Sequence, residues 1–288
     1  MLCYINSKIL DENNAKISIN DRGFMFGDGV FETCHISNQQ ILDFSLHLTR
    51  LKSSLNFLEI AAKIDDLTQK SYQLIKKNNI KNGILRINIS RGQGSIGYLP
   101  KKNIKPNIII QTKKLQKIKD QKISPKISLG ISKKITLNSI SQISQYKTNN
   151  SLNYILAKIE GQKNGFFDNI LLNEKQDICE TSSANIFWCK DNKIYTPSLN
   201  CGILNGTKRQ RIIKICRQQN MSLEEGKFNL KDLKNCQEMF ISNSSFLILE
   251  IDEINIGDNI IKTKTNEISS KILKIFRNDY KNTYTSGI

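Results

Sequence analysis

The stretch "QYKTNNSLNYILAK", Gln145 to Lys158, joins a polar, turn-prone run to a helical pattern. Lys147 lies just before the predicted helix "SLNYILAKIEGQK", which Asn150 or Ser151 can cap. We therefore expect its amine to project from a loop or a helix start. A lysine that is partly desolvated there loses proton affinity and becomes an imine-forming nucleophile. Taken alone, however, a loop lysine is more often solvated surface.

The second lysine of the stretch, Lys158, lies on the predicted helix with Glu160 nearby and is expected to be a solvated surface residue. Composition alone does not distinguish Lys158 from Lys147, because the chain has 43 Lys and Arg and a formal net charge of +17. This charge is mostly lysine spread along the chain, without zinc-finger spacing, a basic zipper or an aromatic ribonucleoprotein motif. We therefore expect no nucleic-acid partner, and the charge favours an anionic small-molecule substrate by steering.

At 288 residues, with 39% hydrophobic and 24% charged residues, the chain has the composition of a globular protein with one large domain or two of ordinary size. It has no run of about 18 apolar residues, and its start lacks the features of a signal peptide. These features predict a cytoplasmic protein with no membrane partner. The 7 cysteines form no C-x-x-C pair and are accompanied by only 2 histidines, so we expect reduced, buried cysteines and no metal site.

The residues before the opening stretch predict an α+β unit. Alternating apolar and polar residues indicate strands in "LCYINSKIL" and "GVFETCHISNQQIL", and "GILRINISRG" and "PNIIIQTKKL" are short and β-branched. Helical spacing in "DFSLHLTRLKSSLNFL" places Leu48, Leu51 and Leu55 on one face. The segment "DDLTQKSYQLIKKNN" begins acidic and ends basic, as a helix dipole prefers.

The segment "QKIKDQKISPK" is basic, polar and carries a proline, which indicates a domain boundary. The linker is predicted at 116–125, between an N-terminal α/β domain, 1–115, and a C-terminal α/β domain, 126–288, that contains Lys147. Strands of the second domain are predicted in "ISLGISKKI", "DNILLNE", "ICETSSANIFWCK", "KIYTPS" and "EMFISNSSFLILEI", and further helices in "GTKRQRIIKICRQQ" and "NEISSKILKIFRNDY".

Further candidates for chemistry are a carboxylate and a set of anion-binding groups. Glu180 falls in the strand-like run "CETSSANIFW", where a buried carboxylate needs a cationic partner such as a protonated heterocyclic nitrogen. The alternative is an edge-strand glutamate in water. Arg50, the helix start "LNGTKRQ" and the hydroxyl run Ser242 to Ser245 suit a phosphate. Each also has a simpler interpretation, as a surface arginine, a helix cap or a turn.

Seven segments, in their order and spacing, resemble the fold-type IV pyridoxal-phosphate enzymes, which include branched-chain aminotransferases, D-amino-acid transaminases and aminodeoxychorismate lyase. The segments are "INDRGFMFGDGVFET", "HLTRL", "ISRGQGSIGY", "YKTNNSLNYILAK", "ETSSANIFW", "KIYTPSLNCGILNGTKRQ" and "EMFISNSS", and they cover almost the whole chain. The resemblance implies two α/β domains with pyridoxal 5'-phosphate at their interface. It also implies a homodimer whose partner chain helps to close the site.

The resemblance also implies roles for particular residues. Lys147 matches the lysine that bonds covalently to the cofactor and later moves protons at the substrate carbon. Glu180 matches the carboxylate that keeps the pyridine nitrogen protonated, which strengthens the ring as an electron sink. The implied phosphate ligands are Arg50, the backbone of Thr207 and Lys208 after Gly206, and Ser244.

Within this family the sequence is most similar to the lyase branch. The segments "VFET" and "SRGxGxxGY" are similar to lyase segments, and Asn243 stands where lyases tend to have Asn. D-amino-acid transaminases instead carry an Arg-x-His trap and a Tyr in place of Phe31, and branched-chain enzymes tend to have a Tyr where this chain has Leu152. The substrate-binding residues that this branch implies are Phe31, Thr33, Arg91, Tyr98 and Asn243.

The implied reaction is an elimination that gives 4-aminobenzoate and pyruvate in folate biosynthesis. The alternatives are a D-amino-acid or branched-chain transaminase and, as a non-enzyme, a nucleic-acid-binding protein. Lyases often have Arg where this chain has Ile96, so a carboxylate anchor is lost unless Arg91 or a nearby lysine replaces it. Thr207 and Lys208 depart from the commoner Ile-Thr pair, although backbone N–H groups still bind phosphate.

Overall fold

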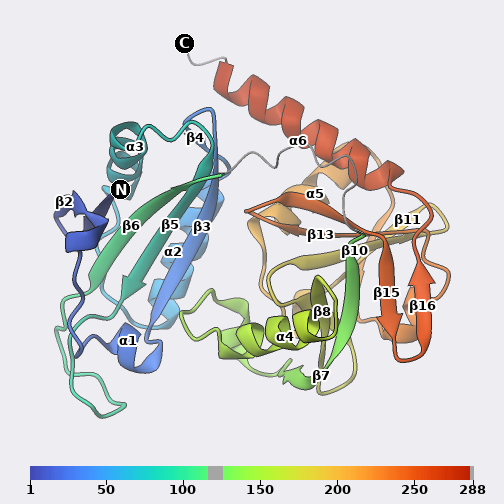
Figure 1. The fold of residues 1–288 in the computed structure, drawn as a ribbon, viewed down its shortest axis with the longest axis horizontal. Coiled ribbons are helices and arrows are strands. Elements are labelled where there is room, and N and C mark those ends of the chain that lie inside the picture. Colours follow the sequence, from blue (N-terminus) through green and yellow to red (C-terminus); the bar gives the residue numbers. More distant parts are fainter. Residues whose placement is uncertain (116–125, 286–288) are drawn as a thin grey trace. The chain divides into compact units, whose positions relative to one another are not determined.

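The computed structural model describes residues 1–115 and 126–285, which divide into two compact units (Figure 1). The first unit consists of the described residues of Met1–Lys119 together with Tyr146–Ser151, and the second of those of Asp120–Gln145 and Leu152–Ile288. The linker predicted at 116–125 lies outside the described residues. The sequence did not indicate that the segment carrying Lys147 returns to the first unit.

The first unit is built on a six-stranded sheet in the order β2-β1-β6-β5-β3-β4, in which every neighbouring pair is antiparallel. In the central pair of β3 and β5, Phe31 lies opposite Asn88 and Thr33 lies opposite Arg86. The strands are β1 (Leu2–Ile5), β2 (Lys8–Asp11), β3 (Gly29–Ser37), β4 (Gln40–Ile41), β5 (Gly83–Ser90) and β6 (Asn107–Lys114).

Two helices pack on one face of this sheet, α2 (Phe44–Phe57) and α3 (Leu67–Lys77). The predicted apolar face of α2 is confirmed, since Leu51 and Leu55 are buried in the core and Leu48 packs against it. The other face of the sheet carries Phe31 and Arg86. The helices are η1 (Glu12–Asn14), α1 (Arg22–Phe26), α2 (Phe44–Phe57) and α3 (Leu67–Lys77).

The second unit is built on a mixed sheet in the order β12-β11-β10-β9-β8-β7-β15-β16, with β13 paired to β10 and β14 paired to β13. The pairs β7–β8, β7–β15 and β11–β12 are parallel. The strands are β7 (Ser128–Leu137), β8 (Asp168–Asn173), β9 (Ile178–Thr181), β10 (Asn185–Lys190), β11 (Lys193–Pro197), β12 (Leu223–Gly226), β13 (Glu238–Asn243), β14 (Leu247–Ile251), β15 (Glu253–Ile256) and β16 (Asn259–Lys262).

The helices of the second unit pack on different parts of this sheet. α4 contacts β7 and β8, α5 contacts β12 and β13, and α6 contacts β14 and α5. Phe187 and Phe240 stack between β10 and β13 in the core beneath α5 and α6. The helices are η2 (Gln142–Gln145), α4 (Leu152–Lys163), η3 (Leu199–Cys201), α5 (Thr207–Gln218), η4 (Leu230–Leu233) and α6 (Glu267–Thr285).

Two segments that were predicted as single strands are each divided by a turn. The segment "ICETSSANIFWCK" forms β9 and β10, because buried Asp168 accepts hydrogen bonds from the hydroxyls of Ser182 and Ser183 and holds the turn between them. The segment "EMFISNSSFLILEI" forms the hairpin of β13 and β14, whose turn is closed on the side chain of Asn243. All 7 cysteines are buried, as predicted, and none is in a disulfide.

Candidate functional site

The main chain of the Lys147 segment extends the sheet of the first unit. The N–H of Phe31 donates to the Lys147 carbonyl over 3.0 Å, the N–H of Asn149 donates to Gly29 over 2.9 Å, and Thr148 forms a bridge with β3. Helix α4 begins only at Leu152. Lys147 therefore lies outside the helix, as predicted, and is fixed by the backbone of β3.

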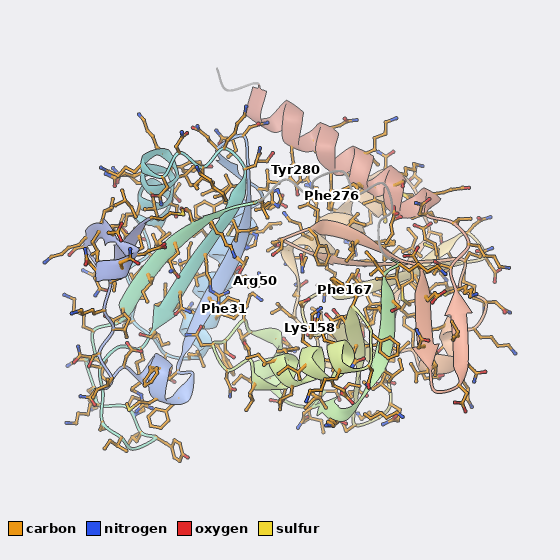
Figure 2. All side chains as sticks on the ribbon, viewed as in Figure 1. Phe31, Arg50, Lys158, Phe167, Phe276 and Tyr280 are labelled. Atoms are coloured by element: carbon orange, nitrogen blue, oxygen red, sulfur yellow. The ribbon has the colours of Figure 1, made fainter. Side chains whose placement is uncertain are left out.

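The side chain of Lys147 lies against an aromatic ring. Its Nζ is 4.3 Å from the ring centroid of Phe31, which projects from β3 on the face opposite the helices (Figure 2). The guanidinium carbon of Arg86 lies 4.2 Å from the same centroid. The structure thus brings together Lys147 and the predicted substrate residue Phe31, and Thr33 follows on the same side of the strand. Arg86 was not among the residues predicted for the site.

Arg50, a predicted phosphate ligand, is oriented by a buried carboxylate. Its Nε and Nη2 each donate to one oxygen of Glu32 over 2.7 Å, and His47 Nδ1 lies 2.7 Å from the same carboxylate. Burial alone would raise the pKa of Glu32, but the charge and hydrogen bonds of Arg50, followed by those of His47, lower it to about 2. The sequence analysis missed Glu32 and His47, although a glutamate at an inward position of the alternating run "GVFETCH" needs a partner.

Arg91, another predicted substrate ligand, is occupied by the protein itself. Its Nε donates to Asp28 over 2.8 Å, and its two Nη atoms donate to the carbonyls of Glu59 and Leu58 over 2.9 and 2.6 Å. These contacts give Arg91 a structural role and argue against substrate binding. Tyr98, which was also predicted to bind the substrate, is 87% exposed.

A second arginine holds the loop that carries Tyr98. Buried Arg22 donates to the carbonyls of Ser95, Gly97 and Tyr98. Its Nε pairs with the same Asp28 oxygen as Arg91 does. The motif "SRGxGxxGY" is therefore a loop tied to the core by two arginines.

In the second unit, Glu180 is 4% exposed on β9, so it is not an edge-strand glutamate in water. Its Oε1 accepts hydrogen bonds from the phenol of Tyr154 over 3.1 Å and from the N–H of Leu204 over 3.3 Å. Its Oε2 accepts from Nδ2 of Asn185 over 3.2 Å. Donors of this kind favour the charged carboxylate. Tyr154 and Asn185 were missed, because nothing in the local sequence indicates that they reach Glu180.

The start of α5 brings together several predicted phosphate ligands. Thr207 Oγ1 lies 3.1 Å from Ser244 Oγ, and the helix is capped by Gly206, which has no side chain. A Cβ at Gly206 would lie 2.1 Å from Oδ1 of Asn185, so only glycine fits there. Lys208 is buried, and its Nζ lies 3.1 Å from the Tyr280 hydroxyl. The role predicted for Lys208 is that of its backbone N–H, which does not depend on this side chain.

Asn243, a predicted substrate ligand, organises the turn that follows β13. Its Oδ1 accepts from the N–H groups of Ser245 and Phe246 over 2.8 and 3.1 Å, and its Nδ2 donates to the Ser183 carbonyl over 3.1 Å. Because Ser244 lies within this turn, Asn243 fixes the main chain around a predicted phosphate ligand.

Lys158 is not the solvated helix residue that was expected. Its Nζ lies 3.6 Å from Oδ2 of buried Asp168, donates to the Phe167 carbonyl and lies over the Phe167 ring (Figure 2). The partner that decides this position, Asp168, lies on a neighbouring strand and not on the helix. Glu160, expected as its neighbour, instead accepts from Ser132 and the N–H of Lys133.

The predicted residues thus form two clusters, one in each unit. The first has the amine of Lys147 on the Phe31 ring, and Arg50 is held by the buried carboxylate of Glu32, which points to the other face of β3. In the second, the carboxylate of Glu180 accepts from three donors. One of these donors, Asn185, also lies beside Gly206 at the start of α5. A helix N-terminus with two hydroxyls suits a phosphate, and a charged carboxylate suits a protonated heterocyclic nitrogen. Each unit by itself thus supplies groups that suit a part of pyridoxal 5'-phosphate.

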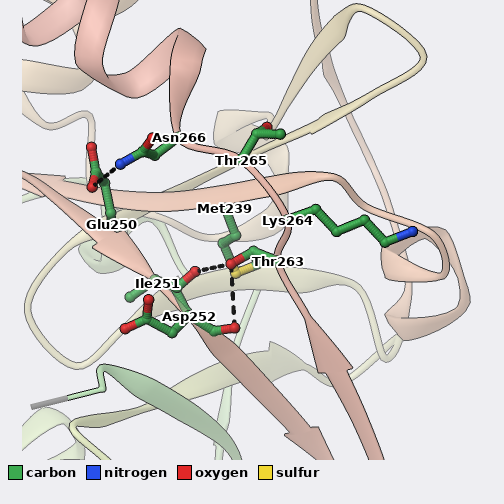
Figure 3. A pocket seen from close by; sticks show the side chains of 8 residues that line it. All are labelled: Met239, Glu250, Ile251, Asp252, Thr263, Lys264, Thr265 and Asn266. Atoms are coloured by element: carbon green, nitrogen blue, oxygen red, sulfur yellow. Dashed lines mark hydrogen bonds between the residues drawn. The ribbon is translucent and has the colours of Figure 1, made fainter.

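A pocket in the second unit lies apart from these residues. Figure 3 shows that it is lined by Met239, the end of β14 and the segment 263–266. Its polar groups are mutually paired, since Thr263 donates to the Ile251 carbonyl and Asn266 donates to Glu250. We assign no function to it. Within the described residues no cluster of His, Cys, Asp and Glu is arranged to hold a metal, and no helix is long and apolar enough to cross a membrane.

Comparisons with known proteins match nearly the whole chain. The family "Amino-transferase class IV" matches residues 29–254. The aminodeoxychorismate lyase of Bacillus subtilis is 29% identical over 98% of this chain and 95% of its own. A putative branched-chain-amino-acid aminotransferase of Methanocaldococcus jannaschii is 28% identical over 96% of both chains. The D-alanine aminotransferase of Staphylococcus aureus is 28% identical over 95% of both.

A solved structure shows the same fold. The putative 4-amino-4-deoxychorismate lyase of Legionella pneumophila superimposes with a TM-score of 0.84 at 28% identity, over 93% of this chain and 97% of that one. Relatives at similar identity thus include a lyase and two kinds of aminotransferase.

Proposed function

We propose that this chain, which belongs to the amino-transferase class IV family, is an aminodeoxychorismate lyase. It shares the fold-type IV architecture of that family, a mixed α/β fold with two sheets. The family consists of pyridoxal-phosphate enzymes, so the chain is a lyase or a transaminase of that class. The proposed reaction is the elimination that converts 4-amino-4-deoxychorismate into 4-aminobenzoate and pyruvate for folate biosynthesis. A D-amino-acid or branched-chain transaminase is the alternative.

The cofactor is proposed to be pyridoxal 5'-phosphate. Bound pyridoxal phosphate supplies an electron sink for the charge left when a proton departs from the substrate. Lys147 would bond to it at rest, and Glu180 would hold the proton on its ring nitrogen. The proposed phosphate ligands are Arg50, Gly206, Thr207, Lys208 and Ser244. The observation that supports this set is the contact of Thr207 with Ser244 beside a position where only glycine fits.

Lys147 is proposed to move the protons of the reaction. Its free amine would act as the base that removes the proton at the amine-bearing carbon of the substrate. The Phe31 ring excludes water from one side of Nζ. Aromatisation of the substrate ring drives the departure of pyruvate. The donors on Glu180 favour its charged form, in which it would stabilise a proton on the ring nitrogen.

The choice of the lyase branch rests on Asn243. In the structure this residue joins the Ser244 turn to the Ser182–Ser183 turn, which follows the strand of Glu180. Its amide thus connects the predicted phosphate end and the predicted nitrogen end of the second cluster. The absence of an Arg-x-His trap after Arg91 also supports the lyase over a D-amino-acid transaminase.

We also propose a homodimer. Four large apolar side chains, at positions i, i+3, i+4 and i+7 of α4, lie on one helix face and are 43% to 60% exposed: Leu152, Ile155, Leu156 and Ile159. An exposed apolar stripe of this kind is typical of a surface that another protein covers. A second copy of the chain is the partner that family resemblance implies.

The proposed function is tested with purified protein. Incubation with pyridoxal phosphate should give a stable yellow protein, and Lys147→Ala should abolish the colour whereas Lys163→Ala, at the exposed end of the same region, should keep it. Aminodeoxychorismate should then yield pyruvate and 4-aminobenzoate. Failure to form these products, with conversion of an amino acid by a keto acid instead, would establish the transaminase alternative.

A further inference from the structure

Residues 146–151, which include Lys147, belong to the first unit, although the residues on both sides of them in the chain belong to the second. Apart from the bridge of Thr148 to β3, they form neither a helix nor a strand. Regular secondary structure therefore does little to fix the backbone of Lys147. Its position depends on the contacts of the neighbouring side chains, which differ on the two sides of the lysine.

On the N-terminal side of Lys147, the ring of Tyr146 stacks on the ring of Phe57. The ring centroids are 3.9 Å apart and the ring planes are inclined by 12°. Phe57 is the last residue of α2, which is anchored in the core by Leu51 and Leu55. An aromatic pair contributes about 0.5–1.5 kcal/mol beyond the apolar area that it buries. Because Tyr146 directly precedes Lys147, the stack fixes the backbone from which the lysine projects.

On the C-terminal side of Lys147, the side-chain amides of Asn149 and Asn88 are bonded to each other twice. Nδ2 of Asn88 donates to Oδ1 of Asn149 over 3.1 Å, and Nδ2 of Asn149 donates to Oδ1 of Asn88 over 3.2 Å. Asn88 lies on β5 directly opposite Phe31, the residue whose ring contacts the Lys147 amine. The amide pair therefore fixes the segment beside that ring.

The turn before β3 leaves room for the same segment through two glycines. A Cβ at Gly29 would lie 2.5 Å from Nδ2 of Asn149, and a Cβ at Gly27 would lie 3.2 Å from the backbone of Asn150. Gly27 also has a φ of 70°, in the left-handed region that favours glycine. The motif "FGDG" thus allows the Lys147 segment to pack closely against the first unit.

We propose that Tyr146 and Asn149 are positioning residues, which hold the amine of Lys147 in place for proton transfer. We call the Tyr146–Phe57 stack and the Asn149–Asn88 pair together the lysine clamp. The inference rests on the proposed function, because it takes Lys147 as the base of the reaction. A displacement of about 1 Å at a reacting group costs roughly 10²-fold in rate. Loss of the clamp should therefore lower kcat and kcat/KM equally, because it affects the transition state and not the binding of the substrate.

The test compares variants that remove a contact of the clamp with one that keeps it. Tyr146→Leu and Phe57→Leu each remove the stack, Asn149→Ala removes the amide pair, and Tyr146→Phe keeps the ring. In the first three, kcat and kcat/KM should fall together by about 10- to 100-fold, and the yellow colour should form more slowly after pyridoxal phosphate is added. Tyr146→Phe should behave as the wild type. The matched control is Tyr195→Leu, which removes a ring stacked on Trp188 in the second unit and should lower the melting temperature without changing kcat.

The outcomes separate this inference from the proposed function. A wild-type protein that takes up no pyridoxal phosphate refutes the proposed function and the role of the clamp with it. A wild type that turns yellow but makes no 4-aminobenzoate refutes the lyase alone, and the rate of colour formation then tests the clamp. Equal loss of kcat in Tyr146→Leu and Tyr195→Leu, or a Tyr146→Phe variant as slow as Tyr146→Leu, refutes the role of the clamp. So does a rise in KM at unchanged kcat.

Discussion

Tyr154 and Glu180 are joined by a hydrogen bond in which the phenol donates to Oε1 over 3.1 Å. Burial, and then the charge of Glu180 and this bond, hold the pKa of Tyr154 well above its usual value. The phenol is therefore protonated at neutral pH and donates to the carboxylate. Helix α4 begins five residues after Lys147, the proposed cofactor lysine. Through Tyr154 the same helix also orients Glu180, the proposed partner of the cofactor nitrogen.

Replacing Tyr154 by Phe should remove one of the donors that hold Glu180 charged. We expect kcat to fall by roughly tenfold, because a hydrogen bond to a charged group contributes about 1.5–3 kcal/mol and the other donors remain. The measurement is steady-state kinetics together with the pyridoxal phosphate dissociation constant. Tyr195→Phe, in the core of the same unit, is the control for loss of a phenol. Equal effects of the two substitutions would contradict the prediction.

The pairing of Glu32 with Arg50 and His47 should make the protein sensitive to acid. Because folding lowers the pKa of Glu32 from 4.5 to about 2, its contribution to stability is present above pH 4.5 and is lost as the pH falls toward 2. The shift corresponds to about 3 kcal/mol of unfolding free energy. Urea unfolding across this pH range should show a flatter profile for Glu32→Gln than for the wild type. The exposed Glu267→Gln should keep the wild-type slope.

The periodicity of apolar residues correctly predicted helices and strands that each lie within one continuous segment. The apolar face of α2 and the alternation of β3 and β5 were readable because burial follows the helical and strand periods directly. The family resemblance made Lys147, Arg50 and Glu180 candidates by their order in the chain, and their roles stay predictions. The turn between β9 and β10 was missed, because the buried Asp168 that holds it precedes the turn on another strand.

Contacts of the site residues could not be predicted either, because their partners lie on other elements of the fold. Glu180 receives donors from helix α4, strand β10 and the loop at Leu204, which are distant in sequence. Lys158 was expected at the surface because its partner is on β8. Arg91 and Arg86 have similar settings in the sequence, near one strand, and only the contacts of their guanidinium groups distinguish them: Arg91 donates to the protein itself, and Arg86 lies over the Phe31 ring.

Gly206 should be essential for the start of α5. In Gly206→Ala the new Cβ would lie 2.1 Å from Oδ1 of Asn185, whose amide also donates to Glu180. Because the buried side chain of Asn185 must shift, we expect a loss of about 1–3 kcal/mol in stability and a pyridoxal phosphate affinity reduced at least about tenfold. Thermal unfolding and cofactor titration measure the two effects. Gly97→Ala, where a Cβ meets nothing within 4 Å, should change neither.

The apolar stripe of α4 should control assembly. Placing a charge in its centre, as in Leu156→Glu, puts an unpaired carboxylate into any interface that this face forms, which costs several kcal/mol. We therefore expect the variant to be a monomer by sedimentation equilibrium at concentrations where the wild type is a dimer. Ile260→Glu, at a 55% exposed position on β16, is the matched control and should leave the dimer intact. A wild-type monomer, or a Leu156→Glu dimer of undiminished affinity, would show that this face is not the interface.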